Sequence, residues 1–198
     1  MSTPSEYPRE RSRRIMLILG SARPGRVALP ITLWVNDVLS DAPDVTVDFV
    51  DLMEEALPFM NEPHPRQGYV HAHSRAWSER VIAADAVIFV APAYGDGFSP
   101  VVRNAIDYLS SEWNGKRTGL VTYGRQAKRL TRRLRRSLHA RGMDVVHPLL
   151  AIEDADARVH GFDFSEDQQS SRACERMISE LRPARGAAPS RLAVEGVA

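Results

Sequence analysis

The sequence predicts an α/β domain in which a parallel β-sheet is covered by helices on both faces. Two observations lead to this prediction. Short apolar runs alternate along the chain with longer segments of helical periodicity. The runs at 15–19 and 86–91 are apolar at every position, as in strands buried on both faces. A helix between consecutive strands returns the chain to the same edge of the sheet, so we expect the strands to be parallel.

The predicted strands are bounded by turn residues. The first run stops at Gly20, and the fourth ends at Tyr123-Gly124. Residues 45–50 instead alternate apolar and polar side chains, which indicates a strand nearer the edge of the sheet. Five strands are predicted, at 15–19, 45–50, 86–91, 118–122 and 144–152.

The predicted helices carry apolar residues three or four positions apart. Leu130, Leu134 and Leu138 define the most regular of these stripes, and Gly142 follows it as a C-cap. Pro100 stands near the start of another helix, where proline costs little. Five helices are predicted, at 28–39, 70–84, 100–112, 127–140 and 165–181.

Length and composition limit the classes of protein to which the chain can belong. Its 198 residues suffice for one domain, predicted at 14–182, with a disordered arm at 1–13 and a disordered tail at 183–198. The net charge of +1 excludes binding of nucleic acid through overall charge. The single cysteine, Cys174, excludes a disulfide framework and a multi-cysteine metal site, and we expect no bound metal. No apolar run is long enough to span a membrane, and no export signal is recognised, so we expect a cytoplasmic protein with no membrane or nucleic-acid partner.

The loop after the first strand, 20–27, has the features of an anion site. It joins a buried strand to a helix, where free backbone N–H groups and the helix dipole favour a phosphate. Ser21 adds a hydroxyl donor, and Arg23 and Arg26 add guanidinium groups. The loop lacks both the Gly-Lys-Ser/Thr and the G-x-G-x-x-G patterns of nucleotide-binding loops. An ordinary turn with exposed arginines is the alternative interpretation.

The loop after the third strand, 91–100, could lie against a flat ligand. Its two prolines and two glycines allow a close backbone approach, and Tyr94 could stack on a ring or be a half-buried core aromatic. The alternation of strands and helices suits either a flavodoxin-like sheet or half of a dinucleotide-binding fold. Both architectures bind ligands beyond the carboxyl ends of their strands.

Two stretches carry a resemblance to a known family. GSARPGRVALPITLWV, followed by YVHAHSRAWSERVIAADAVIFVAPAYGDGFSPVVRNAIDYLSSEWNGKRTGLVTYG, resembles the NADPH-dependent FMN reductases, a family of flavodoxin-like flavoproteins. The resemblance covers roughly residues 14–150. It implies a flavodoxin-like five-stranded parallel sheet with helices on both faces. It also implies an FMN-dependent oxidoreductase that takes hydride from NADPH and reduces flavin, a quinone or a similar small acceptor.

The resemblance also implies a set of cofactor-binding residues. The first loop would hold the FMN phosphate through Ser21, Arg23 and the backbone around Arg26 and Val27. The isoalloxazine ring would lie along Pro92, Ala93, Tyr94 and Gly95, with Thr122, Tyr123 and Gly124 near its other edge. No catalytic acid or base is expected, because the flavin carries the chemistry, and nearby backbone N–H groups would stabilise the negative charge of the reduced ring.

The chain departs from the family pattern at two places. Gly95 and Ser99 stand where the family usually has asparagine and proline, and residues 125–128 (RQAK) replace several glycines. A member that has lost or altered flavin binding, and acts as a binding protein or with another chemistry, is therefore the alternative. A member that supplies reduced flavin to a partner enzyme is a further possibility.

Three weaker features have competing interpretations. The family commonly forms homodimers or homotetramers, and the loop 52–69 with the following helix, bearing Trp77, is our candidate contact; Trp77 could equally be internal. The arginines between 128 and 141 could bind nucleic acid or the 2′-phosphate of NADPH, but a solvated helix face is favoured. His71 and His73 are two residues apart in a helical segment, so a metal pair is not expected.

Overall fold

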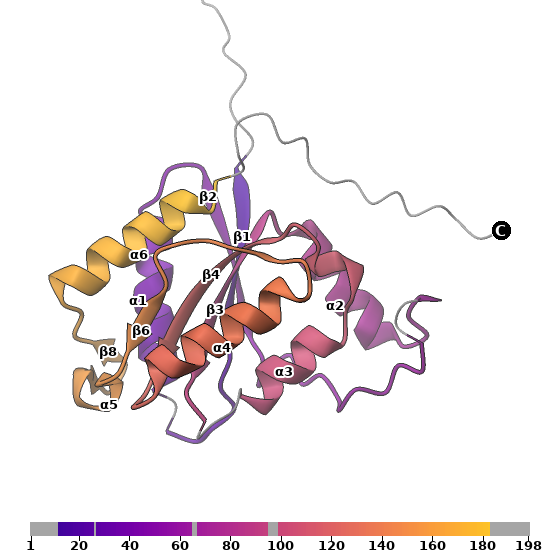
Figure 1. Ribbon diagram of the computed structural model, residues 1–198, viewed down its shortest axis with the longest axis horizontal. Helices are drawn as coiled ribbons and strands as arrows, with labels where there is room; N and C mark the ends of the chain where they lie inside the picture. Colours follow the sequence, from indigo (N-terminus) through magenta and orange to yellow (C-terminus); the bar gives the residue numbers. More distant parts are fainter. Residues whose placement is uncertain (1–11, 26, 65–66, 95–98, 183–198) are drawn as a thin grey trace, which may run out of the picture.

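The computed structural model describes residues 12–25, 27–64, 67–94 and 99–182 (Figure 1). The predicted tail at 183–198 and residues 1–11 of the predicted arm lie outside these ranges, as do Arg26 and Gly95. The first strand begins at Arg13, one residue before the predicted start of the folded domain.

The core of the molecule is a six-stranded sheet. Its strands are all parallel, in the order β2-β1-β3-β4-β5, with β6 also paired to β4. This confirms the predicted parallel sheet, and β2 stands at the edge, as its alternating sequence indicates. The strands are β1 (Arg13–Leu19), β2 (Val45–Asp51), β3 (Ala86–Pro92), β4 (Arg117–Tyr123), β5 (Asp144–Val145) and β6 (Leu150–Ile152).

The last predicted strand, 144–152, is divided into two. β5 pairs with the start of β4 and β6 with its end, and the segment around His147-Pro148 leaves the ladder between them. A proline has no N–H to donate to a neighbouring strand, so the ladder is interrupted where Pro148 stands.

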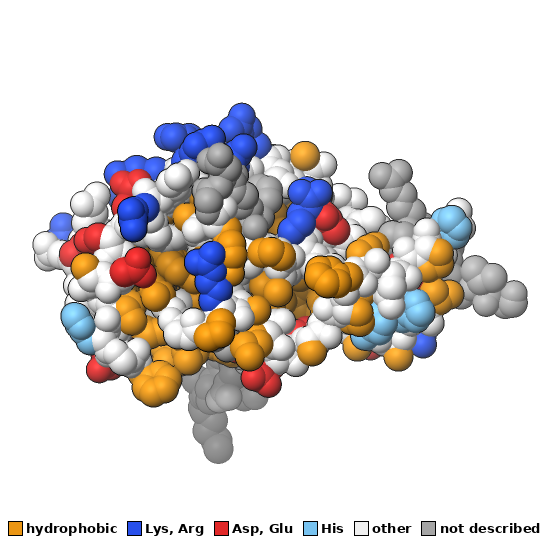
Figure 2. All heavy atoms as spheres, turned by 90° about the horizontal axis from the view of Figure 1, so that it is seen from below, with side chains coloured by type: hydrophobic (Ala, Val, Ile, Leu, Met, Phe, Trp, Pro, Cys, Tyr) orange, Lys and Arg blue, Asp and Glu red, His pale blue; other side chains and the backbone are white. Residues whose placement is uncertain are grey.

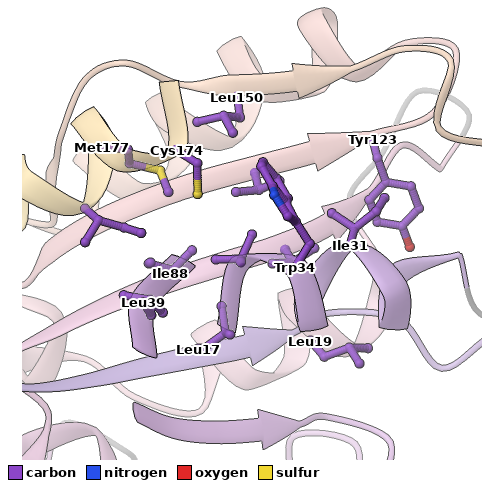
Figure 3. Close-up of a cluster of buried hydrophobic side chains, with 14 of the residues drawn as sticks. Leu17, Leu19, Ile31, Trp34, Leu39, Ile88, Tyr123, Leu150, Cys174 and Met177 are labelled. Carbon is purple, nitrogen blue, oxygen red and sulfur yellow. The ribbon is translucent and has the colours of Figure 1, made fainter. Parts of the chain in front are cut away.

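Helices cover both faces of the sheet. α1 (Ala28–Ser40) and α6 (Gln168–Glu180) pack on one face, and α2 (Ala72–Ala83), α3 (Pro100–Asp107) and α4 (Ala127–His139) on the other (Figure 1). Alternate residues of each strand supply the two cores. Leu17 and Leu19 of β1 point toward α1 and α6, where Cys174 and Met177 lie (Figure 3), whereas Met16 and Ile18 join the opposite core.

Two segments differ from the predicted elements. The helix predicted at 100–112 ends at Asp107 and is followed by a short 3-10 helix, η2 (Ser111–Trp113). After β6, an unpredicted unit contains the one-turn helix α5 (Ala155–Arg158) and a hairpin of β7 (Val159–His160) and β8 (Asp163–Phe164). Phe164 packs on Trp34 of α1 at a ring-centroid distance of 5.2 Å, which fixes this unit against the sheet. Among the described helices, none is long and apolar enough to cross a membrane.

Candidate functional site

Three loops meet at the carboxyl edge of the sheet because β1, β3 and β4 are neighbours in it. We call the loops after β1, β3 and β4 the first, second and third loop, respectively. Backbone hydrogen bonds join them. Gly20 N donates to Val90 O at 2.9 Å, and Ala93 N donates to Tyr123 O at 2.7 Å. Figure 2 looks onto this end of the molecule and shows hydrophobic side chains across its middle, with Lys and Arg gathered along its upper border. The edge therefore offers an apolar surface with cationic groups beside it.

The first loop packs closely against β3 and α3 at Gly20. A Cβ on Gly20 would lie 2.4 Å from Val102 Cγ2 and 2.9 Å from Val90 O, so no larger residue fits there without movement. The buried Ser21 accepts the backbone N–H of Arg23 on its Oγ at 3.4 Å and keeps its own O–H to donate. The Arg23 side chain is exposed, and Arg26 lies outside the described residues.

The N-terminus of α1 completes this loop. Half-buried Val27 precedes the helix, and among the described residues no side chain caps it and no carboxylate lies in its first turn. The positive end of the helix dipole is thus left without a negative partner. A phosphate would supply one, so the residues present fit the phosphate of FMN.

Among the described residues of the second loop, Tyr94 is the aromatic side chain at this edge. Pro92 is buried at the end of β3, whereas Ala93 and Tyr94 are half-buried, and Gly95 lies outside the described residues. Tyr94 belongs to neither hydrophobic core. Instead, the guanidinium carbon of Arg23 lies 3.6 Å from the centroid of its ring.

At the third loop, the side chains of Thr122 and Tyr123 are buried, and the expected approach of these residues to the ring stays a prediction. Thr122 is fully buried and its hydroxyl bonds Ala127 O at 3.1 Å. Tyr123 points into the core beside Ile31 of α1 (Figure 3). Gly124, at φ +100°, turns the chain toward α4.

The N–H groups at this edge are partly in use already. Ala93 N–H donates to Tyr123 O, and Gly124 N–H donates to Ile152 O at 2.8 Å. Neither of these two N–H groups is free, so stabilisation of the reduced ring by other backbone N–H groups of the loops stays a prediction.

The sequence profile of the NADPH-dependent FMN reductases matches residues 13–157. The chain belongs to this family. It is 35% identical over 115 residues to an NAD(P)H-dependent FMN reductase of Schizosaccharomyces pombe, covering 56% of this chain and 58% of the relative. It is 31% identical over 147 residues to an NAD(P)H-dependent FMN reductase of Saccharomyces cerevisiae, covering 67% and 77%. A third such relative, from a Nectria species, is 36% identical over 121 residues, covering 57% and 60%. The match thus spans about three fifths of the S. pombe and Nectria relatives.

Solved structures show that this FMN reductase family member has a flavodoxin-like fold. It matches FerB, a flavoenzyme NAD(P)H:(acceptor) oxidoreductase from Paracoccus denitrificans, with a TM-score of 0.68 and 17% identity, over 85% of this chain and 94% of FerB. It matches oxidised flavodoxin 1 from Bacillus cereus with a TM-score of 0.53 and 16% identity, over 86% and 97%.

Asn104 has a role at this edge that the sequence analysis did not assign. Its Oδ1 accepts Met60 N–H at 3.0 Å, and its Nδ2 donates to Pro58 O at 2.6 Å. The side chain therefore fixes the long loop after β2 and holds Phe59 in solvent, 88% exposed. Asn104 stands in the Arg-Asn-Ala-Ile-Asp-Tyr-Leu motif that carries the family resemblance, and that motif was the signal available in the sequence.

Glu112, in η2, is a buried carboxylate. Its Oε1 accepts hydrogen bonds from Tyr69 Oη at 2.6 Å and Ser78 Oγ at 2.7 Å. Burial alone would raise its pKa, but these hydrogen bonds outweigh burial and lower the pKa. Burial, and then the proximity of Glu112, raise the pKa of Tyr69. With its lone pairs committed between α2 and η2, Glu112 holds the scaffold together.

Two features lie apart from these three loops: the histidine pair His71 and His73, and a cavity at the amino edge of the sheet. Among the described residues, no group of three or more His, Cys, Asp or Glu side chains is placed to hold a metal; His71 and His73 stack with ring centroids 5.1 Å apart. A cavity of about 380 Å³ lies at the opposite, amino edge of the sheet, between the end of α1 and α6. Arg13, Asp41 and Glu175 are among its lining residues.

Proposed function

We propose that this protein is an FMN-dependent oxidoreductase that takes hydride from NADPH and reduces flavin, a quinone or a similar small acceptor. One observation carries the proposal: the loops after β1, β3 and β4 meet at one edge, with an uncapped helix N-terminus and Arg23 beside Tyr94. Membership of the FMN reductase family supports the same conclusion.

Different residues would bind the phosphate and the ring of FMN. Ser21 Oγ, the Arg23 guanidinium and the backbone around Val27 would hold the phosphate. Ala93, Tyr94 and the turn at Gly124 would lie along the ring, with little side-chain bulk at Ala93 and Gly124 to obstruct it. FMN held there would supply the redox chemistry, namely hydride acceptance from the nicotinamide and electron transfer to the acceptor. The protein orients the ring and needs no acid or base of its own.

The alternative is a family member that has lost or altered flavin binding. Gly95 lies outside the described residues, but Arg125 and Gln126 have exposed side chains at the turn before α4, which favours an open ring site. Purified protein is expected to be yellow and to release FMN on denaturation. A colourless protein that binds no FMN at millimolar concentration would favour the alternative. NADPH oxidation with and without added acceptor then distinguishes a self-sufficient reductase from one that serves a partner.

We infer NADPH rather than NADH from the charge beside the site. Residues 113–143 contain ten Lys and Arg and no acidic residue, and α4, which carries most of them, begins directly after the third loop. An additional phosphate on the reductant would gain from this field.

We also propose that the protein forms a homodimer or homotetramer through the loop after β2 and the start of α2. Large apolar side chains are exposed there, among them Phe59 and Val70. Trp77 is fully buried, with its Nε1 bonded to Ala105 O at 2.9 Å, so it is internal and takes no part in this contact. Sedimentation of the wild type and Phe59→Asp tests the proposal: the variant is expected to be smaller, and equal masses would contradict it.

The cytoplasm is the proposed location. The single cysteine, Cys174, is a buried free thiol on α6, as suits a reducing compartment. Fractionation of cells that contain the protein checks this, and recovery in an organelle or in the medium would contradict it.

A further inference from the structure

One contact joins the two halves of the proposed flavin site. The guanidinium carbon of Arg23, from the loop after β1, lies 3.6 Å from the ring centroid of Tyr94, from the loop after β3. At this distance the guanidinium lies over one face of the ring, well within the range of a cation–π interaction. Arg23 and Tyr94 are the residues assigned above to the phosphate and the ring of FMN, respectively.

The Arg23 side chain can exchange the Tyr94 ring for a phosphate. Its backbone is held by Ser21 Oγ, whereas its side chain is exposed and, among the described residues, forms no ion pair. A guanidinium binds a phosphate through charge-assisted, often bidentate hydrogen bonds, which are stronger than an exposed cation–π contact. A phosphate seated at the N-terminus of α1 would therefore draw the guanidinium away from Tyr94.

We propose that Arg23 couples the phosphate site to the ring site and so selects phosphorylated flavins. With the guanidinium on Tyr94, a flat ring must displace it to reach that face. FMN displaces it through its own phosphate, whereas riboflavin has no phosphate to receive it. Arg23 therefore raises the preference for FMN in two ways. It strengthens FMN binding through the phosphate, and it weakens binding of unphosphorylated flavins because it covers Tyr94. This rests on the proposed function, because it concerns the same flavin site.

The first experiment measures dissociation constants for FMN and riboflavin, by quenching of flavin fluorescence, on the wild type and Arg23→Gln. FMN is expected to bind about tenfold more weakly to the variant, from the lost charge-assisted bonds. Riboflavin is expected to bind about threefold more tightly, because Tyr94 is uncovered. Arg172→Gln, on the exposed face of α6, is the control for loss of one positive charge.

The two affinities separate this proposal from simpler ones. An arginine that only binds phosphate would weaken FMN and leave riboflavin unchanged, and that result would overturn the coupling while leaving the proposed function intact. Absence of binding of both flavins to the wild type would reject the proposed function and the coupling together. Tyr94→Leu should reduce the effect of Arg23→Gln on riboflavin to nothing.

A second experiment adds inorganic phosphate without altering the protein. Phosphate at tens of millimolar should tighten riboflavin binding to the wild type, because it takes the guanidinium from Tyr94, and should have no such effect on Arg23→Gln. Sodium chloride at equal ionic strength is the control. Riboflavin affinity that is unchanged or weakened by phosphate in the wild type would overturn the proposal.

Discussion

Gly20 sets how closely the first loop approaches β3. A Cβ at this position would lie 2.4 Å from Val102 Cγ2 and 2.9 Å from the Val90 carbonyl oxygen, and the carbonyl belongs to the sheet and cannot rotate away. Gly20→Ala is therefore expected to lower the free energy of unfolding by about 1–3 kcal/mol and to weaken FMN binding, because the loop must move outward. Urea denaturation followed by circular dichroism measures the first effect.

Ala22→Ser provides the matched control for this prediction. It also adds one heavy atom to the same loop, but its side chain is exposed. A Gly20→Ala protein as stable as Ala22→Ser would show that the loop accommodates the methyl group without cost.

The sequence predicted which residues lie at the site more reliably than it predicted which way their side chains point. Ser21, Arg23 and Tyr94 lie at the carboxyl edge because they follow strands that are recognisable as apolar runs. Thr122 and Tyr123 are expected near the ring, and because both side chains are buried, only their backbone could approach it. They are consecutive residues of a strand covered on both faces, so one points into each core. The contact between Arg23 and Tyr94 joins residues 71 positions apart, which no local pattern reveals.

At the scale of elements, the start of α2 is capped by a side chain from the preceding loop. No side chain at its own N-terminus does so, and instead Glu62 accepts the backbone N–H groups of Val70 at 3.1 Å and His71 at 2.9 Å. Burial by itself would raise the pKa of Glu62, but the hydrogen bonds it accepts lower the pKa to about 2. The carboxylate therefore stabilises the fold above its ordinary pKa of 4.5, and this contribution is lost as the pH falls toward about 2.

Glu62→Gln is expected to lower Tm above about pH 5, where the carboxylate is ionised in both the folded and the unfolded chain. The difference in Tm from the wild type should shrink as the pH is lowered toward about 2. Glu79→Gln, an exposed carboxylate of α2, is the control for loss of one negative charge. A Tm difference that stayed constant down to the lowest pH would show that ionisation of Glu62 does not stabilise this helix.

The extent of the elements depends on contacts that the sequence does not display. The helix predicted at 100–112 ends early because Ser110 N–H is held by Glu112 Oε2 at 3.1 Å. Lys116 Nζ then donates to Val81 O in the last turn of α2 and to Ala84 O just after it, at 2.9 and 2.6 Å. Glu112 and Lys116 both belong to the Glu-Trp-Asn-Gly-Lys motif of the family resemblance. The motif thus joins α2, α3 and β4, whereas the sequence alone could not distinguish a structural motif from a catalytic one.

The whole molecule carries a strongly uneven charge that its net value of +1 conceals. The ten Lys and Arg of residues 113–143 give this segment a charge of +10. The buried stripe of Leu130, Leu134 and Leu138 confirms the predicted core face of α4, and Arg132 and Arg136 on the other side of the helix are exposed. Lys128 and Arg141 pair with Glu153 and Asp107, but Arg132 and Arg136 form no ion pair with any described residue.

This asymmetry predicts that the reaction depends on salt and on the charge of the reductant. Unscreened positive charge attracts anions, so kcat/KM for NADPH should exceed that for NADH at low ionic strength. Added salt screens this attraction, because the Debye length is about 10 Å at 0.1 M, so kcat/KM for NADPH should fall more steeply than that for NADH. Reversing Arg132 and Arg136 to Glu should reduce kcat/KM for NADPH by about 3- to 10-fold at low salt and much less at high salt.

The matched control reverses Arg172 and Arg176 of α6, on the other face of the sheet. Equal losses for NADPH and NADH would show that the field of α4 attracts the shared diphosphate and does not select the 2′-phosphate. Equal effects of the α4 and α6 reversals would show that the field acts through net charge alone, without direction.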